Sequence, residues 1–317
     1  DLRGRLAILR VHTKCVPMDD DVDLEIMARG TPGFVGADLQ NLVNEAALLA
    51  AKQDGSRVEM KHFEGAKDKV ILGTERRSLV MSEEDKRMTA YHEGGHALVA
   101  MMNKDSDPVH KVTIIPRGMA LGLTLTMPTE DQYSLSKNQL AARIEHAMGG
   151  RAAEKLIFGE LSTGASNDLK QATGLARSMV CDYGMSEQLG PVYYGNDGND
   201  VFLGRDWTSH KEMSEKTAEQ IDAEIKVMLD AGYAEALRIL TEKREVLDCI
   251  AEALLERETL NREDLALLLE GKPLPPVPPV SEVEPTRESE VGEKSAQKPV
   301  EVDEVFPGNK IPDPLPS

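Results

Sequence analysis

The chain has 317 residues, 40% of them hydrophobic and 29% charged, which suits a soluble chain with a buried core and, at this length, two domains. Its 37 Lys plus Arg stand against 55 Asp plus Glu, and the resulting net charge of −18 argues against a protein that binds nucleic acid through phosphates. The three cysteines, Cys15, Cys181 and Cys249, are far apart, which excludes a disulfide scaffold and a cysteine-type zinc finger.

The first 75 residues are predicted to form a small helical unit. The first of its four expected helices carries Leu2, Leu6 and Leu9, and the second covers Val22–Arg29. The third is expected to start at Gly36, and the fourth to cover Lys61–Ile71. Pro17 and Gly73 end the first and the last of them. Asp38 lies in the first turn of the third helix, where a carboxylate is favoured by the helix dipole.

Residues 77–271 are predicted to form a second, larger domain that is mainly helical with a small β element. Ser82 and the acids after it favour the start of a helix that runs to about Met102. The stretch Val109–Thr126 has the composition of strands. Further helices are expected over Lys137–Phe158, Asn167–Asp182, Thr217–Leu240, Arg244–Arg257 and Arg262–Leu269.

The C-terminal residues 272–317 are predicted to be a disordered tail. Eleven of the 17 prolines lie from Pro273 onward, among Glu, Ser and Lys, so the segment cannot bury enough apolar surface to fold. The run Pro275-Pro276-Val277-Pro278-Pro279 leaves open a ligand for a domain that binds polyproline helices.

The strongest chemical signal is the sequence His92-Glu93-Gly94-Gly95-His96 inside a predicted helix. Residues four apart lie on one helix face, so the two imidazoles can share one tetrahedral zinc ion. Glu93 then lies beside the position that holds water and is predicted to be the catalytic base. Because the motif lies inside a helix that periodicity predicts independently, a zinc site is favoured over two unrelated histidines.

A hydrolytic zinc site needs a third protein ligand. Val99 and Met102 stand where the metzincin pattern requires Gly and His, which excludes that class. The remaining candidates are His110, His146, Glu154, Glu160, Asp168 and Asp182. Spacing alone leaves Glu154 and Asp168 both open, since Asp168 at a helix start could equally be a dipole-stabilising acid.

Several longer motifs occur in a fixed order: Asp1-Leu2-Arg3-Gly4-Arg5, Gly30-Thr31-Pro32-Gly33-Phe34-Val35-Gly36-Ala37-Asp38-Leu39, Asn44-Glu45-Ala46-Ala47, Pro108 to Gly118, and Ser162 to Leu169. Together they resemble the FtsH family of membrane-anchored, ATP-dependent zinc metalloproteases, over residues 1 to about 270. The resemblance implies a helical AAA+ lid in 1–75 and a zinc peptidase domain in 77–271. It also implies that Asp168 is the third zinc ligand beside His92 and His96, and that Glu154 is a supporting acid.

The resemblance further implies a homo-hexamer that hydrolyses unfolded or damaged membrane and cytosolic proteins in protein quality control, driven by ATP. Such a protein is anchored in the bacterial inner membrane with its catalytic part in the cytoplasm. This chain has no apolar run long enough to span a membrane and begins without Met, so we expect a soluble piece whose anchor lies before residue 1.

Two features depart from the family pattern. Gly94 stands where the common motif has Ala, and the phosphate-binding GxxxxGK[ST] sequence is absent. Gly36, Ala37 and His12 match positions near the adenine of ATP, but a helix start and a core histidine explain them equally well. Two alternatives therefore stay open: a zinc peptidase that works without ATP, and a catalytically silent subunit of a AAA+ ring.

Overall fold

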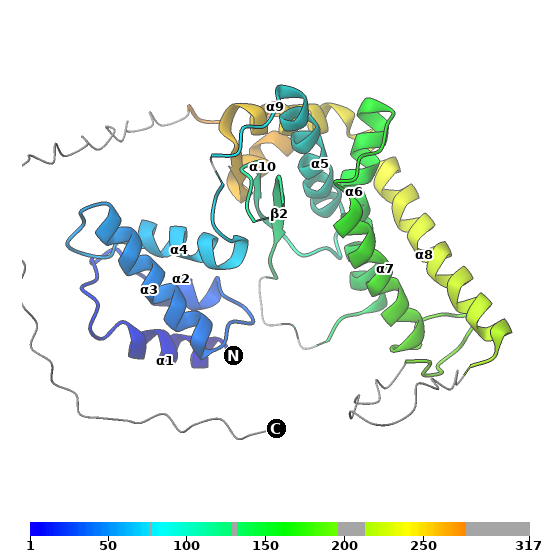
Figure 1. Cartoon of the computed structure of the whole chain (residues 1–317), viewed down its shortest axis with the longest axis horizontal. Coiled ribbons are helices and arrows are strands. Elements are labelled where there is room, and N and C mark those ends of the chain that lie inside the picture. The colour runs from blue at the N-terminus through cyan, green and yellow to red at the C-terminus, as the bar shows by residue number, and fades with distance from the viewer. Residues whose placement is uncertain (77, 119, 129–131, 133, 196–212, 277–317) are drawn as a thin grey trace, which may run out of the picture. The chain divides into compact units, whose positions relative to one another are not determined.

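The computed structural model describes residues 1–76, 78–118, 120–128, 132, 134–195 and 213–276 (Figure 1). Its elements are α1 (Leu2–His12), α2 (Leu24–Arg29), α3 (Gly36–Lys52), α4 (Met60–Leu72), α5 (Glu83–Met102), β1 (Val109–Thr113), β2 (Leu123–Thr126), α6 (Lys137–Phe158), α7 (Ser166–Cys181), α8 (Glu215–Glu242), α9 (Arg244–Arg257), β3 (Thr259–Asn261) and α10 (Arg262–Leu269). The predicted mainly helical fold with a small β element is confirmed. Most of the predicted tail, 277–317, lies outside the described residues, and none of the described helices is long and apolar enough to cross a bilayer.

The four N-terminal helices pack around a core of their own. Leu9, Met27, Leu39, Leu42 and Phe63 are fully buried in it. Helix α2 begins at Leu24, two residues after the predicted start, because the Asp23 side chain accepts hydrogen bonds from the first free backbone amides. Gly73 ends α4 with a φ of 82°, a conformation that favours glycine.

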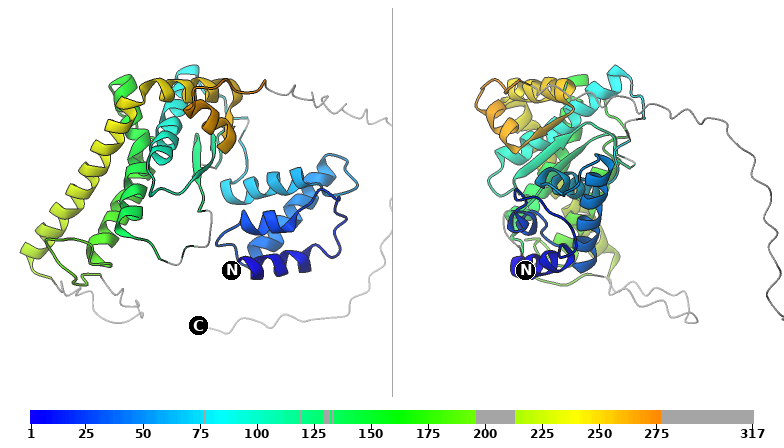
Figure 2. Two further views of the ribbon diagram at one scale, coloured as in Figure 1. Left: turned by 180° about the vertical axis from the view of Figure 1, so that it is seen from behind. Right: turned by 90° about the vertical axis from the view of Figure 1, so that its left-hand side faces the viewer.

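A second core lies among α5 to α10, and α5 runs through it. Most residues of α5 from Thr89 to Ala100 are buried, against α6 on one side and α9 on another. Helices α6, α7 and α8 lie against one another, and the left view of Figure 2 shows the yellow-green α8 alongside the green α6 and α7. Capping by Ser82 and by Ser136 sets the starts of α5 and α6.

The small sheet has the strand order β2-β1-β3, and both pairings are antiparallel. The stretch predicted as strand is therefore two strands, with residues 114–122 forming the connection between them. Strand β3 was not predicted, because its three residues are too short to show a period and lead directly into α10. Strand β2 lies at one edge of this sheet and crosses beside α5, so the sheet brings Thr124 close to the middle of that helix.

The segment that connects the two groups of helices is held by Arg117. Its guanidinium donates to the Gly73 carbonyl at 2.9 Å and to the Glu75 carboxylate at 2.6 Å, and it is almost fully buried. Arg76 donates in return to the Gly118 carbonyl at 2.8 Å. These charge-assisted contacts hold residues 73–76, which connect the two groups of helices, against residues 117–118, which follow β1.

Candidate metal centre

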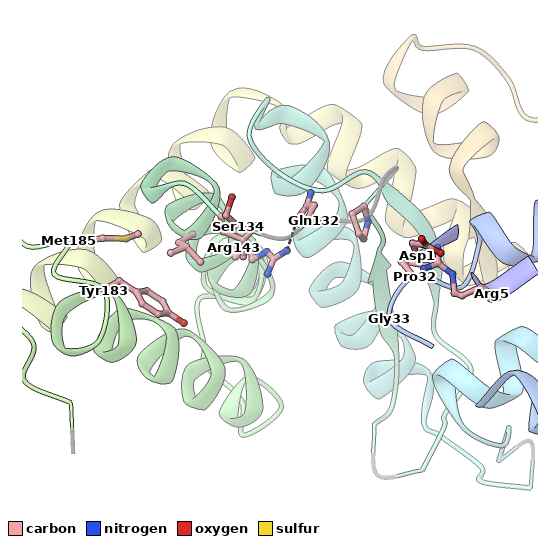
Figure 3. Close-up of a pocket in the computed structure, with 12 residues that line it drawn as sticks. Asp1, Arg5, Pro32, Gly33, Gln132, Ser134, Arg143, Tyr183 and Met185 are labelled. Atoms are coloured by element: carbon pink, nitrogen blue, oxygen red, sulfur yellow. Dashed lines mark hydrogen bonds between the residues drawn. The ribbon is translucent and has the colours of Figure 1, made fainter. Parts of the chain in front are cut away.

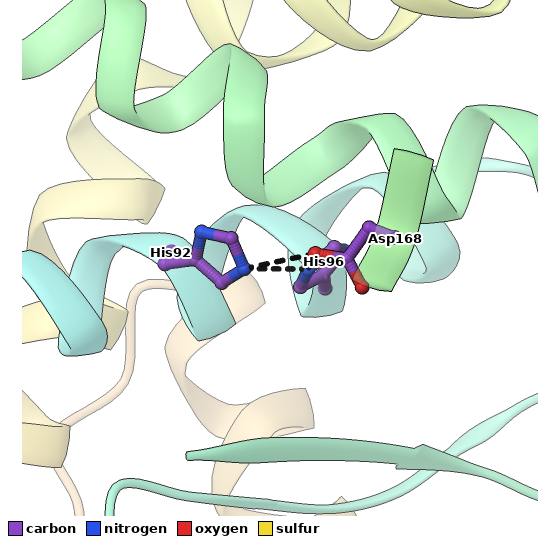
Figure 4. A group of neighbouring side chains, drawn as sticks. All are labelled: His92, His96 and Asp168. Carbon is purple, nitrogen blue, oxygen red and sulfur yellow. Dashed lines mark hydrogen bonds and ion pairs between the residues drawn. The ribbon is translucent and has the colours of Figure 1, made fainter. Parts of the chain in front are cut away.

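Three potential ligands come together from two helices. His92 and His96 project from one face of α5, and Asp168 lies in the first turn of α7 (Figure 4). The Nε2 atoms of the two histidines lie 3.1 Å apart. The nearer carboxylate oxygen of Asp168 lies 3.2 Å from His92 Nε2 and 3.5 Å from His96 Nε2.

The opposite nitrogen of each imidazole has its own partner. His96 Nδ1 lies 2.7 Å from the carbonyl oxygen of His146, which can only accept, so Nδ1 carries the proton. His92 Nδ1 lies 2.8 Å from the Glu154 carboxylate and donates to it in the same way. In the neutral imidazoles both Nε2 atoms then present lone pairs to the same small space.

This arrangement fits a zinc ion. In a tetrahedron with zinc–ligand bonds of about 2.0–2.1 Å, neighbouring ligand atoms lie roughly 3.3–3.4 Å apart. The three observed separations of 3.1, 3.2 and 3.5 Å bracket that value. Three electron-rich atoms this close repel one another unless a cation or a shared proton lies between them, and two imidazoles with one carboxylate are a donor set typical of catalytic zinc.

The electrostatics of the cluster also favour a cation. Burial lowers the pKa of His92, but contacts with the carboxylates of Asp168 and Glu154 outweigh it and raise this pKa to about 10. Burial raises the pKa of Asp168, and its hydrogen bonds with the two histidines outweigh that and hold this pKa well below its usual value. Burial and nearby His96 lower the pKa of His146 to about 4, which keeps its imidazole neutral. The negative potential that draws a proton to His92 would draw a divalent cation to the same place.

Glu154 contacts His92 on its Nδ1 side, away from the space that the two Nε2 atoms and Asp168 share. One of its oxygens accepts from His92 Nδ1, and Ser162 donates to both oxygens through its backbone N–H and its hydroxyl, at 2.8 and 2.9 Å. Burial raises the pKa of Glu154, but these hydrogen bonds outweigh it and keep the carboxylate ionised. Glu154 therefore orients the His92 imidazole and makes it a stronger ligand for a metal ion.

Glu93 lies beside the cluster in a nearly dry environment. Its side chain is buried, and burial raises its pKa, which suits a group that must take up a proton near neutral pH. The Thr124 hydroxyl lies 2.8 Å from its Oε2 atom and 3.0 Å from its backbone carbonyl.

A glycine on α6 makes room for the two imidazoles. A Cβ atom on Gly150 would lie 2.5 Å from His92 Cε1 and 2.6 Å from the Nε2 atoms of both His92 and His96. No side chain fits there, so glycine at this position leaves space for the ligand nitrogens and for an ion between them.

The structure separates the predicted site residues clearly. It brings Asp168 to the two histidines and places Glu154 behind His92. His146 approaches His96 through its backbone carbonyl, and His110 lies in β1 among charges of α4. Glu160 is exposed just beyond α6, and Asp182 caps the end of α7.

The predicted nucleotide positions lie on the N-terminal helices. His12 is the last residue of α1, and Gly36 and Ala37 are the first two residues of α3. Sequence reasoning missed Thr124, Ser162 and Gly150. The sequence carries no signal for their contacts, because each depends on a residue between 8 and 58 positions away.

An open pocket elsewhere is lined by Arg5 and Gly33 of the N-terminal helices and by Arg143 and Tyr183 of the other group (Figure 3). Arg143 donates to the Gln132 side chain at 3.4 Å within it. None of the three clustered ligands lines this pocket, so the pocket and the histidine cluster are two different places in the structure.

Comparison with known proteins supports the same chemistry. Residues 79–268 match peptidase family M41, and residues 21–65 match the AAA+ lid domain. The chain is 59% identical to ATP-dependent zinc metalloprotease FtsH 4 of Sorangium cellulosum over 277 residues, which cover 87% of this chain and 43% of the relative. It is 56% identical to ATP-dependent zinc metalloprotease FtsH of Magnetococcus marinus over 273 residues, 86% of this chain and 41% of the relative. The chain thus spans less than half the length of these relatives. The match covers both groups of helices, and the chain belongs to peptidase family M41 and to the FtsH family that its motifs resemble.

Proposed function

We propose that this chain is a zinc-dependent endopeptidase with His92, His96 and Asp168 as its metal ligands and Glu93 as its catalytic base. One observation carries the proposal: three lone-pair donors lie 3.1–3.5 Å apart, and both imidazoles are held with Nε2 facing the shared space. A zinc ion bound there would supply a Lewis acid that polarises the scissile carbonyl and lowers the pKa of an attacking water molecule.

The protein's own residues supply the proton transfers. Glu93 accepts the proton of the attacking water on a carboxylate oxygen and then delivers it to the nitrogen of the leaving amine. Its burial favours the protonated form that exists between these two steps. Glu154 and the His146 carbonyl keep the two imidazoles in the tautomer that leaves Nε2 free to bind metal.

Strand β2 is suited to hold the substrate. In the described residues it pairs only with β1, so its other edge can add an extended peptide through main-chain hydrogen bonds. Such binding depends little on side chains, which suits a protease that acts on many unfolded sequences. Thr124 of the same strand contacts Glu93, which brings this edge close to the catalytic base.

For the full-length protein we propose coupling to ATP hydrolysis, with unfolded or damaged membrane and cytosolic proteins as substrates. In that protein, residues 1–75 form the lid of the AAA+ module, 77–271 the peptidase domain and 272–317 a tail. Gly36, Ala37 and His12 contact nucleotide only together with an ATPase core. The family resemblance further supports a homo-hexamer at the bacterial inner membrane, with its catalytic domain on the cytoplasmic side.

The silent-subunit alternative is disfavoured because the three proposed ligands lie together and the proposed base, Glu93, lies beside them. Metal analysis of the purified chain tests the proposal. We expect about one zinc ion per chain, and His96→Ala should empty the site because two ligands hold zinc far more weakly. Full zinc occupancy in that variant would show that the metal binds elsewhere. Hydrolysis of an unfolded peptide should stop on chelation and return when zinc is added back.

A further inference from the structure

Thr124 lies on β2 opposite the middle of α5, with its hydroxyl between two acceptors of Glu93. Oγ1 is 2.8 Å from the carboxylate atom Oε2 and 3.0 Å from the backbone carbonyl. An ionised carboxylate and a carbonyl can only accept, so Thr124 is the donor in either contact. Within the described part of the chain, this hydroxyl is the hydrogen-bond donor that the structure gives the Glu93 carboxylate.

The contact is made where water has little access. The Glu93 residue is 7% exposed, so a carboxylate without a donor there would be costly. Gly122, which directly precedes β2, limits where the Glu93 side chain can lie. A Cβ atom on Gly122 would be 2.7 Å from Glu93 Cγ and 2.9 Å from Oε1, so the observed position of Glu93 requires glycine at 122.

From this geometry we propose that Thr124 is a positioning residue for the catalytic base. Its hydroxyl holds Oε2 and so fixes the orientation of the carboxylate that exchanges the proton. Because Thr124 belongs to the edge strand, the strand that offers its main chain to the substrate also sets the orientation of Glu93. The inference rests on the proposed function of Glu93 and deepens it.

The kinetic test replaces Thr124 by valine and by serine in the full chain. Valine keeps the shape and the strand preference but lacks the hydroxyl, whereas serine keeps the hydroxyl. For hydrolysis of an unfolded fluorogenic peptide, T124V should lower kcat about 10- to 100-fold with KM and zinc content unchanged. T124S should recover most of the loss. The control T241V removes an exposed hydroxyl of α8 that bonds only within its own helix, and it should leave kcat unchanged.

A second measurement does not depend on activity. Thermal unfolding of the metal-stripped chain is compared for T124V, E93A, which removes the acceptor, and the double variant. If Thr124 holds the Glu93 carboxylate, T124V lowers the Tm by several degrees, and the double variant loses less than the sum of the single losses. Additive losses, an unchanged kcat in T124V, or a loss that lies in KM would each overturn the inference. A failure of the proposed function can be distinguished from a failure of this inference. In that case the unmodified chain would hydrolyse no peptide, while the Tm losses of the two single variants would still be non-additive.

Discussion

Gly95 of α5 and Gly149 of α6 touch backbone to backbone. A Cβ atom on Gly95 would lie 2.5 Å from the Gly149 carbonyl oxygen, and one on Gly149 would lie 2.7 Å from that of Gly95. The close crossing allows His96 Nδ1 to reach the His146 carbonyl and places Gly150 in front of both imidazoles. The spacing of the metal centre thus depends on two residues that have no side chain.

Gly95→Ala should destabilise the protein, because the methyl group would meet backbone atoms that cannot move independently. The overpacking should cost about 1–3 kcal/mol or more, which exceeds the gain of roughly 1 kcal/mol in helix propensity. Gly94→Ala is the matched control, since its methyl group would meet only the side chains of Ile250 and Leu247 at 3.3 and 3.4 Å. Thermal unfolding should show a lower Tm for the first variant and little change for the second. Equal Tm values would contradict the account of this crossing.

Gly150→Ala should impair metal binding directly. Its methyl group would lie 2.6 Å from both Nε2 atoms and compete with the ion for the same space. We expect about one zinc ion per chain in the unmodified protein, and the zinc content of purified Gly150→Ala should fall well below that value. Gly174→Ala in α7 is the control, because nothing lies within 4 Å of its added methyl group. A fully occupied Gly150→Ala protein would place the metal away from this glycine.

Asp168 and Glu154 should differ sharply in their effect on zinc. Asp168→Asn replaces a charged ligand by a poor, uncharged donor, so it should weaken zinc binding and abolish proteolysis. Glu154→Gln keeps a hydrogen-bond acceptor near His92, so most of the zinc should remain and activity should fall about 10- to 100-fold at most. Zinc titration into both chelator-stripped variants checks this. Tight binding in the Asp168 variant with loss in the Glu154 variant would reverse the two assignments.

The parts of the fold with long periodic patterns could be predicted from the sequence. The helices over 83–102, 137–158 and 244–257 have apolar faces, the first two begin at the capping residues Ser82 and Ser136, and all three lie where expected. The His-Glu-Gly-Gly-His motif could be placed on one helix face, because that relation is local. Strand β3 could not be predicted, since its three residues are specified by pairing with β1 and carry no pattern of their own.

The choice of Asp168 as the proposed third ligand shows where local reasoning stops. Spacing left Glu154 and Asp168 open, because the choice depends on how α6 and α7 pack against α5. The crossing at Gly95 and Gly149 brings Glu154 to His92 Nδ1 and leaves the Nε2 side to Asp168. Thr124 was missed for the same reason, since the position of β2 against α5 is a tertiary property.

The most direct test of the account is to measure zinc content and peptide hydrolysis together in Glu93→Gln. The amide keeps the shape of the side chain but cannot take up the water proton. About one zinc ion per chain should therefore remain, while hydrolysis falls about 10²-fold or more. A Glu93→Gln protein with full zinc and undiminished turnover would contradict the central claim that Glu93 is the base of a zinc peptidase.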